Sequence, residues 1–129
     1  MHFHLPVEDV EFEIPDVWWN EASADKHEKA AEAFAALSDT QWPTVLVPIG
    51  DVIAPRRDPG IEGLRRERTI AVLRAVIEGT PLPPLEVHRP PGSLRLVVRD
   101  GFHRYFVSVA LGYSLLPVSI RPYFDFNTL

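Results

Sequence analysis

The stretch Asp100-Gly101-Phe102-His103-Arg104-Tyr105 decides the fold, because a strand pattern ends at it and a helix pattern begins. The apolar run from Leu94 to Val98 before it has strand character. The run from Phe102 to Leu111 after it predicts a helix with one apolar face, formed by Phe102, Phe106, Val109 and Ala110. We therefore expect a strand, a sharp turn at Gly101 and a helix.

The start of this helix is a candidate site for an anion. The first backbone N–H groups of a helix lack partners within it, and Asp100 is placed to cap them. His103 and Arg104 add donors that suit phosphate. A capping carboxylate would repel an anion, unless Mg²⁺ or a rotated Asp100 side chain resolves the conflict. The alternative is that Asp100 only caps, Arg104 pairs with an acid and His103 bonds to the backbone.

Length and composition predict one domain with its own core, since the chain has 129 residues. The absence of Cys excludes thiolate chemistry and disulfides and suits a reducing, cytoplasmic setting. No apolar stretch approaches the roughly 20 residues of a membrane span, so we expect no membrane association. The sequence contains no recognisable constellation of metal ligands.

Charge is divided unevenly along the chain. Residues 1–42 hold ten Asp and Glu against two Lys, whereas residues 43–129 hold eight acids against eleven Arg. A basic region made of arginine alone suits fixed recognition of phosphate or carboxylate. The overall charge of −5 argues against direct DNA binding by the protein alone.

Residues 1–42 are expected to form an acidic strand–helix extension. The alternating run within Phe3 to Ile14 predicts a strand, and Trp18 and Trp19 follow in an expected turn. This tryptophan pair either offers a platform for a ligand or closes a small core, and we favour the core.

A helix is then expected from Ser23 or Asp25 to Leu37. Its apolar face would consist of Ala30, Ala33, Phe34 and Leu37. Its acidic face is either solvated or folds over the arginines of the second part.

Residues 43–129 alternate between short strands and two helices. Further strands are expected at residues 44–49, 85–88 and 116–120, and residues 85–88 should pair with 94–98 as a hairpin. A long helix from about Leu64 to Glu78 should end at Gly79, and its buried stripe would be Ile70, Leu73, Val76 and Ile77. The loop from Ile53 to Gly60 before it carries Arg56 and Arg57.

The long helix starts with Arg65, Arg66 and Arg68, and Thr69 lies beside them. Cations at this position oppose the helix dipole, which favours acids. Either an anion belongs near these arginines, or Glu62, Glu67 and solvent compensate their charge.

Across about residues 45–121, this order of elements resembles the ParB/sulfiredoxin superfamily. The likeness is carried by Pro55 with Arg56 or Arg57, Ile70-Ala71-Val72-Leu73, Gly79, Pro83-Pro84-Leu85, the stretch from Asp100 to Tyr105, and Ala110-Leu111-Gly112. The resemblance implies an α+β fold, in which residues 43–129 form a small mixed sheet packed with helices. Residues 1–42 would be an addition to that domain.

Members of this superfamily bind nucleotide phosphates at a G-x-x-R segment. ParB partition proteins use CTP, sulfiredoxins use ATP, and a free serine kinase uses ADP. The resemblance implies that His103 and Arg104 hold phosphate, helped by the amides after Gly101, with Arg56 or Arg57 facing them. The candidate nucleotide-binding residues are Gly101, Phe102, His103, Arg104, Arg56, Arg57, Arg68 and Thr69. The choice among ATP, ADP and CTP stays open, as does a requirement for Mg²⁺.

Departures from the family patterns narrow the chemistry. Phe102 stands where sulfiredoxins carry a catalytic Cys, so reduction of sulfinic acids is excluded. Partition ParB proteins carry G-E-R-R and a following DNA-reading domain; here Phe102-His103 replaces Glu-Arg, and the chain ends at Leu129. We therefore expect no role in chromosome partition.

Three functions then compete. The first is a nucleotide- or phosphate-binding module that acts as a switch or an assembly factor. The second is a nucleotide-dependent phosphotransferase or hydrolase, in which Asp100 is a base or metal ligand and Glu62 or Glu67 the second acid. The third is a DNA-associated nuclease or regulator. The expected partners are a nucleotide or phosphorylated small molecule, and a protein or second subunit at the aromatic tail from Pro122 to Leu129.

Overall fold

A five-stranded mixed sheet forms one side of the molecule, and helices cover it. The computed structural model describes residues 1–27 and 32–123. The sheet strands are β3 (Thr44–Pro48), β4 (Val52–Ile53), β5 (Leu85–His88), β6 (Leu96–Asp100) and β7 (Leu115–Ile120), in the order β3-β7-β5-β6-β4. The main helices are α2 (Arg66–Glu78) and α3 (Phe102–Ala110). This arrangement confirms the predicted α+β fold with a small mixed sheet.

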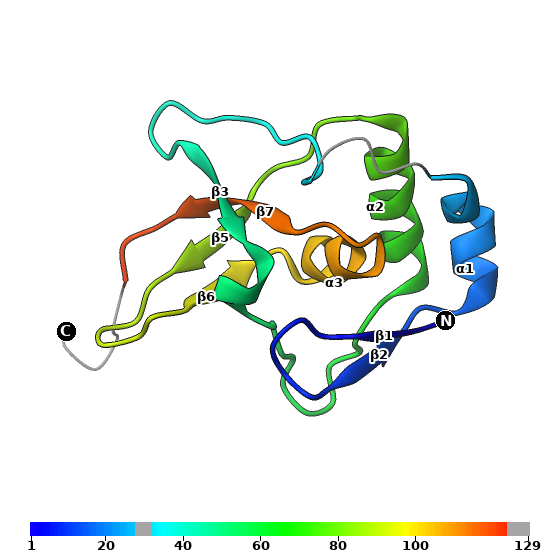
Figure 1. Ribbon diagram of the computed structural model, residues 1–129, viewed down its shortest axis with the longest axis horizontal. Coiled ribbons are helices and arrows are strands. Elements are labelled where there is room, and N and C mark those ends of the chain that lie inside the picture. Colours follow the sequence, from blue (N-terminus) through cyan, green and yellow to red (C-terminus); the bar gives the residue numbers. More distant parts are fainter. Residues whose placement is uncertain (28–31, 124–129) are drawn as a thin grey trace.

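Strand pairing places α3 at the centre of the domain. Strands β5 and β6 form the predicted antiparallel hairpin, and β7 then pairs in parallel with β5 and antiparallel with β3. Helix α3 connects β6 to β7, and Figure 1 shows it between the sheet and α2. Because α3 is covered from two sides, its buried residues are not confined to one narrow face.

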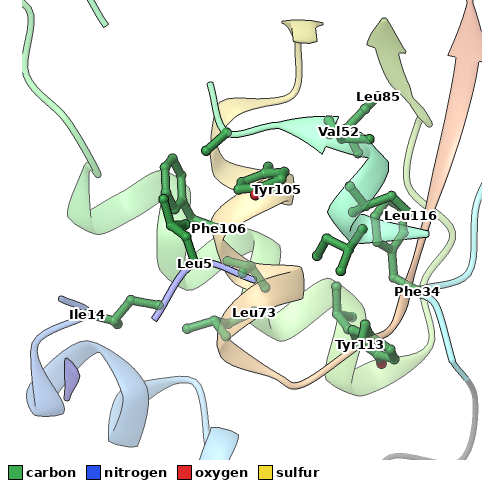
Figure 2. Close-up of a cluster of buried hydrophobic side chains, with 14 of the residues drawn as sticks. Leu5, Ile14, Phe34, Val52, Leu73, Leu85, Tyr105, Phe106, Tyr113 and Leu116 are labelled. Carbon is green, nitrogen blue, oxygen red and sulfur yellow. The ribbon is translucent and has the colours of Figure 1, made fainter. Parts of the chain in front are cut away.

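The N-terminal region packs against the same core as the rest of the chain. It contains a hairpin of β1 (His2–His4) and β2 (Glu11–Glu13), the short helix α1 (Asp16–Glu21) and a 3₁₀ turn at Ala24–Lys26. Figure 2 shows Leu5, Ile14 and Phe34 in one cluster with side chains of α2, α3 and the sheet. The core thus crosses the expected boundary at residue 42, although the regular strands of the large sheet lie beyond it.

Several expectations for residues 1–42 are wrong in detail. The stretch from Phe3 to Ile14 is a hairpin rather than one strand, and Trp18 and Trp19 lie in α1 rather than in a turn. Trp19 is buried and Trp18 half-buried against the core, as the core interpretation predicts.

The predicted helix from Ser23 or Asp25 to Leu37 is also wrong where the structure describes it, and Ala30 lies outside the described residues. Residues 32–43 are irregular, because their backbone pairs with the segment before β5. The N–H of Leu82 donates to the Ala35 carbonyl, and the N–H of Leu37 donates to the Leu82 carbonyl. This tertiary pairing outweighs the helical spacing of Ala33, Phe34 and Leu37, the last of which is exposed.

The junction after β6 differs from expectation in two ways. Asp100 is the last residue of β6 and does not cap α3; Gly101 occupies the cap position, and no side chain bonds to the free amides there. The most buried residues of α3 are His103, Tyr105, Phe106, Val107 and Ser108. Of the predicted face, only Phe106 is buried, whereas Phe102, Val109 and Ala110 are partly buried and pack against the core.

The turn at Gly101 has no room for a side chain. Its φ is 131°, and a Cβ added there would lie 2.5 Å from Cγ of Leu85. The backbone therefore needs glycine for conformation and for close approach to β5.

We expect Gly101→Ala to lower the free energy of unfolding by about 3 kcal/mol, because it adds both backbone strain and overpacking. Urea denaturation measures this loss. Gly79→Ala is the matched control, because Gly79 also has a positive φ, of 74°, but its added Cβ would meet nothing within 4 Å. The control should cost about 1 kcal/mol, and equal losses in the two variants would contradict the steric argument.

Candidate anion-binding site

A cleft opens where β6 ends and α3 begins. Its volume is about 310 Å³, and its opposite wall is the loop that follows β4. Three arginines line it: Arg56 and Arg57 from the loop, and Arg99 from β6. Asp58, Asp100, Gly101 and Phe102 also line it. The cleft thus contains five of the predicted site residues, which are Arg56, Arg57, Asp100, Gly101 and Phe102. Arg99 and Asp58 also line it and were not predicted from the sequence.

The charge in this cleft favours an anion. Three arginines face two aspartates, and the N-terminus of α3 adds partial positive charge. Within residues 1–27 and 32–123, none of the three arginines forms an ion pair, whereas Arg66, Arg74, Arg104 and Arg121 do. The guanidinium groups that line the cleft are therefore not neutralised by an ion pair with a described carboxylate.

Arg57 is held in place by an aromatic ring. Its guanidinium lies over the ring of Phe102, 4.3 Å from the ring centroid. Its Nε is buried and has no hydrogen-bond partner among the described residues. A buried donor without a partner is costly, so a ligand oxygen at this position would remove an unsatisfied group.

Arg104 is turned away from the cleft. Its Nη1 donates to the backbone carbonyls of Pro83 and Pro84, and its Nη2 lies 3.4 Å from Oδ2 of Asp100. The Arg104 side chain is 13% exposed, against 71% for Asp100. Burial lowers the pKa of Arg104, and the charge of Asp100 partly restores it. Arg104 therefore joins α3 to the segment before β5, as in the alternative in which it pairs with an acid.

His103 is a buried structural residue. Its Nε2 accepts a hydrogen bond of 3.0 Å from the backbone N–H of Arg65, which immediately precedes α2. Burial lowers the pKa of His103 to about 4, with further lowering by Arg57, Arg68 and Arg65. The imidazole is therefore neutral at pH 7 and contributes no charge to the cleft.

The remaining predicted residues lie elsewhere. Arg68 lines a neighbouring depression with Arg104 and Asp100, so Asp100 stands between the two hollows. Thr69 is completely buried, and its Oγ1 has no hydrogen-bond partner among the described residues. Thr69 is therefore not accessible to a ligand.

The acidic N-terminal region does reach one group of arginines. Glu21, the last residue of α1, forms ion pairs with Arg66 and Arg74 of α2. The acidic segment therefore covers arginines of α2 rather than those of the cleft. Neither Glu62 nor Glu67 lines the cleft, and the second carboxylate there belongs to Asp58.

Alternation along β6 could have identified Arg99. Leu96 is buried and Val98 packs against the core, so the alternation of a strand places Arg99 on the opposite face of β6. Asp58 gave no comparable signal, because it lies in an irregular loop whose course depends on tertiary packing.

In the described part of the chain, no group of three or more His, Asp or Glu could hold a metal ion. No helix within the same residues has the length and apolar character needed to cross a membrane.

Only the start of the aromatic tail lies within the described residues. Its Tyr123 ring centroid lies 5.5 Å from that of His88, whereas Phe124 and Phe126 lie outside the described residues.

Comparisons with known proteins do not assign a family. No family model matches the chain, and no curated protein matches it significantly. The ParB/sulfiredoxin resemblance therefore stays a prediction that rests on the order of the elements and on the stretch from Asp100 to Tyr105.

The buried imidazole predicts an acid-sensitive fold. His103 binds a proton with a pKa of about 4 in the folded protein and near 6.5 in the unfolded chain. Between these values the unfolded chain binds more protons, so stability is fully present above pH 6.5 and falls as the pH drops toward 4. The loss attributable to His103 should be about 3 kcal/mol.

Urea denaturation between pH 4 and 7 measures this loss. His103→Gln is the matched control, because its amide oxygen can accept the Arg65 N–H bond but does not titrate in this range. Its pH dependence should be flatter than that of the parent, and parallel curves for the two proteins would refute the assignment. The His103 pKa can also be read directly by NMR.

Proposed function

We propose that the protein binds the phosphate groups of a nucleotide or phosphorylated small molecule in the cleft at the start of α3. The observation that carries this proposal is that Arg56, Arg57 and Arg99 line one cleft with the N-terminus of α3, whose first amides no side chain caps. Arginine forks match phosphate oxygens, and helix N-termini favour negative charge. The protein would then act as a binding or regulatory module of the ParB/sulfiredoxin type.

The division of roles differs from the one implied by the resemblance alone. Arg56, Arg57 and Arg99 would contact the phosphate, together with amides at the start of α3. His103 and Arg104 would hold this helix against α2 and the segment before β5. Phe102 would keep the Arg57 guanidinium oriented through the cation–π contact.

We expect calorimetry to detect binding of at least one of ATP, ADP, CTP and GTP, tested with and without Mg²⁺. Arg57→Gln should weaken that binding about 10- to 100-fold, because it removes a charge-assisted contact to phosphate. Arg74→Gln is the matched control, since Arg74 is an exposed arginine of α2 outside the cleft. If none of these nucleotides binds, or if the two variants behave alike, the proposal fails.

A nucleotide-dependent phosphotransferase or hydrolase is the second candidate. The observation in its favour is that two carboxylates, Asp58 and Asp100, line the same cleft as the arginines. Mg²⁺ in nucleotide sites is commonly held by one or two carboxylates and the phosphates themselves, so these two residues would fit it. When bound, the ion would neutralise phosphate charge. Asp100, which is largely exposed, would orient it or accept a proton.

This enzymatic alternative predicts turnover of the bound nucleotide that Asp100→Asn abolishes. Asparagine keeps the size of the side chain but removes the charge and the basic oxygen, so binding should survive. Release of phosphate or transfer to a hydroxyl acceptor would be measured for both proteins, with Asp39→Asn as a control far from the cleft in sequence and outside its lining. If the parent protein binds nucleotide without turnover, the enzymatic alternative is wrong and the proposed binding function stands.

A further inference from the structure

An apolar groove of about 470 Å³ lies beside the arginine cleft. It is formed where the N-terminal region meets α3 and the loop before α2, and its main apolar walls are Phe12, Trp18, Leu64, Phe102 and Phe106. Its one charged residue is Glu13 of β2. An open hollow with three or more aromatic walls and a single carboxylate is suited to a flat ligand that carries N–H donors.

The groove and the cleft share a wall. Phe102 lines both, and the Arg57 guanidinium lies 4.3 Å from its ring centroid. On the groove side, the rings of Phe102 and Phe106 are 4.9 Å apart, and those of Phe106 and Phe12 are also 4.9 Å apart. Aromatic surface therefore continues from the phosphate-binding arginine to the N-terminal hairpin.

We propose that this groove holds the base of the same nucleotide whose phosphates bind the arginine cleft. This inference rests on the proposed function, which concerns the phosphates, and it extends the binding site to the base of the nucleotide. The cleft and the groove have volumes of about 310 and 470 Å³, which suit the two parts of one small ligand. Trp18 and the phenylalanines supply flat apolar surface on which a base can stack.

Glu13 favours bases that carry an amino group. A carboxylate only accepts hydrogen bonds, and adenine, cytosine and guanine each present an exocyclic NH₂ donor. Uracil has a carbonyl oxygen in place of that amino group and keeps a single ring N–H between two carbonyl oxygens, so it offers the carboxylate a poorer donor edge. The Glu13 side chain is 56% exposed, and its Oε2 lies 3.8 Å from Nε2 of His2, which is beyond hydrogen-bond distance, so the carboxylate oxygens can still accept hydrogen bonds from a base. The preferred ligand is therefore a nucleotide of adenine, cytosine or guanine rather than of uracil.

Gly63 offers a way to block the groove without disturbing the fold. It lines the groove, a Cβ built on it meets nothing within 4 Å, and its φ lies outside the range in which side chains are strained. Gly63→Val therefore adds a branched side chain to a residue of the groove lining, at little cost to the folded state. Trp18→Ala removes a stacking surface instead, and Trp42→Ala is its matched control, because Trp42 lies under Arg121 in a different hollow.

The test compares the affinities of ATP, CTP, GTP and UTP with that of inorganic tripolyphosphate, by calorimetry on the full chain. Tripolyphosphate carries the anionic part alone, so the ratio of affinities reports the base. At least one of ATP, CTP and GTP should bind about tenfold or more tightly than tripolyphosphate, in line with the contribution of base–aromatic stacking. UTP should bind more weakly than these three.

In Gly63→Val and Trp18→Ala the ratio of nucleotide to tripolyphosphate affinity should fall to about one, whereas Trp42→Ala should keep the parental ratio. Glu13→Gln should remove the discrimination against UTP, because an amide can donate as well as accept.

If all four nucleotides and tripolyphosphate bind equally in the parent protein, the base does not occupy the groove, and phosphate binding stands alone. If nothing binds, the proposed function itself is wrong. If Gly63→Val instead abolishes a concentration-dependent dimer seen by sedimentation, the groove is a subunit contact and the inference is overturned.

Discussion

The close approach of the Gly101 backbone to Leu85 is the constraint on which the central part of this structure depends. It lets β6 end and α3 begin within a single residue, so that α3 turns back beneath the sheet before β7. The same turn sets the direction of the first residues of α3. Successive residues on a helix lie about 100° apart, so Phe102 reaches the cleft while His103 is buried and Arg104 extends to Pro83.

Sequence patterns were sufficient where local signals agreed with tertiary packing. The β5–β6 hairpin, α2 with its end at Gly79, α3 and β7 all lie close to their predicted residues. In these segments periodicity, turn residues and burial lead to the same structure. The stretch after Ala24 fails this condition. Its alanine-rich spacing is helical, but Ala35 and Leu37 exchange backbone hydrogen bonds with Leu82, and no pattern within the stretch itself reveals that partner.

The sequence indicated where the candidate site lies, but not which of its residues line the cleft and which hold α3 in place. The motif from Asp100 to Tyr105 does border the arginine-lined cleft. A linear motif cannot tell which of two adjacent polar side chains points outward, and here His103 and Arg104 both serve the backbone of neighbouring segments. The cation–π contact between Arg57 and Phe102 explains why an aromatic residue suits the first variable position of the G-x-x-R segment. Arg57 and Phe102 lie far apart in the sequence, so their contact could not be predicted from local sequence patterns.

The position of β7 has a consequence for how the chain folds. It is the last strand of the described residues, yet it lies between β3 and β5 and pairs with both. Until it is in place, β3 and β5 each expose an unpaired edge, and the pairing of Thr44 with Ser119 closes a long loop. Such non-local pairing slows folding, and open edges favour association with other chains. During synthesis, the sheet therefore stays incomplete until residues 115–120 have left the ribosome.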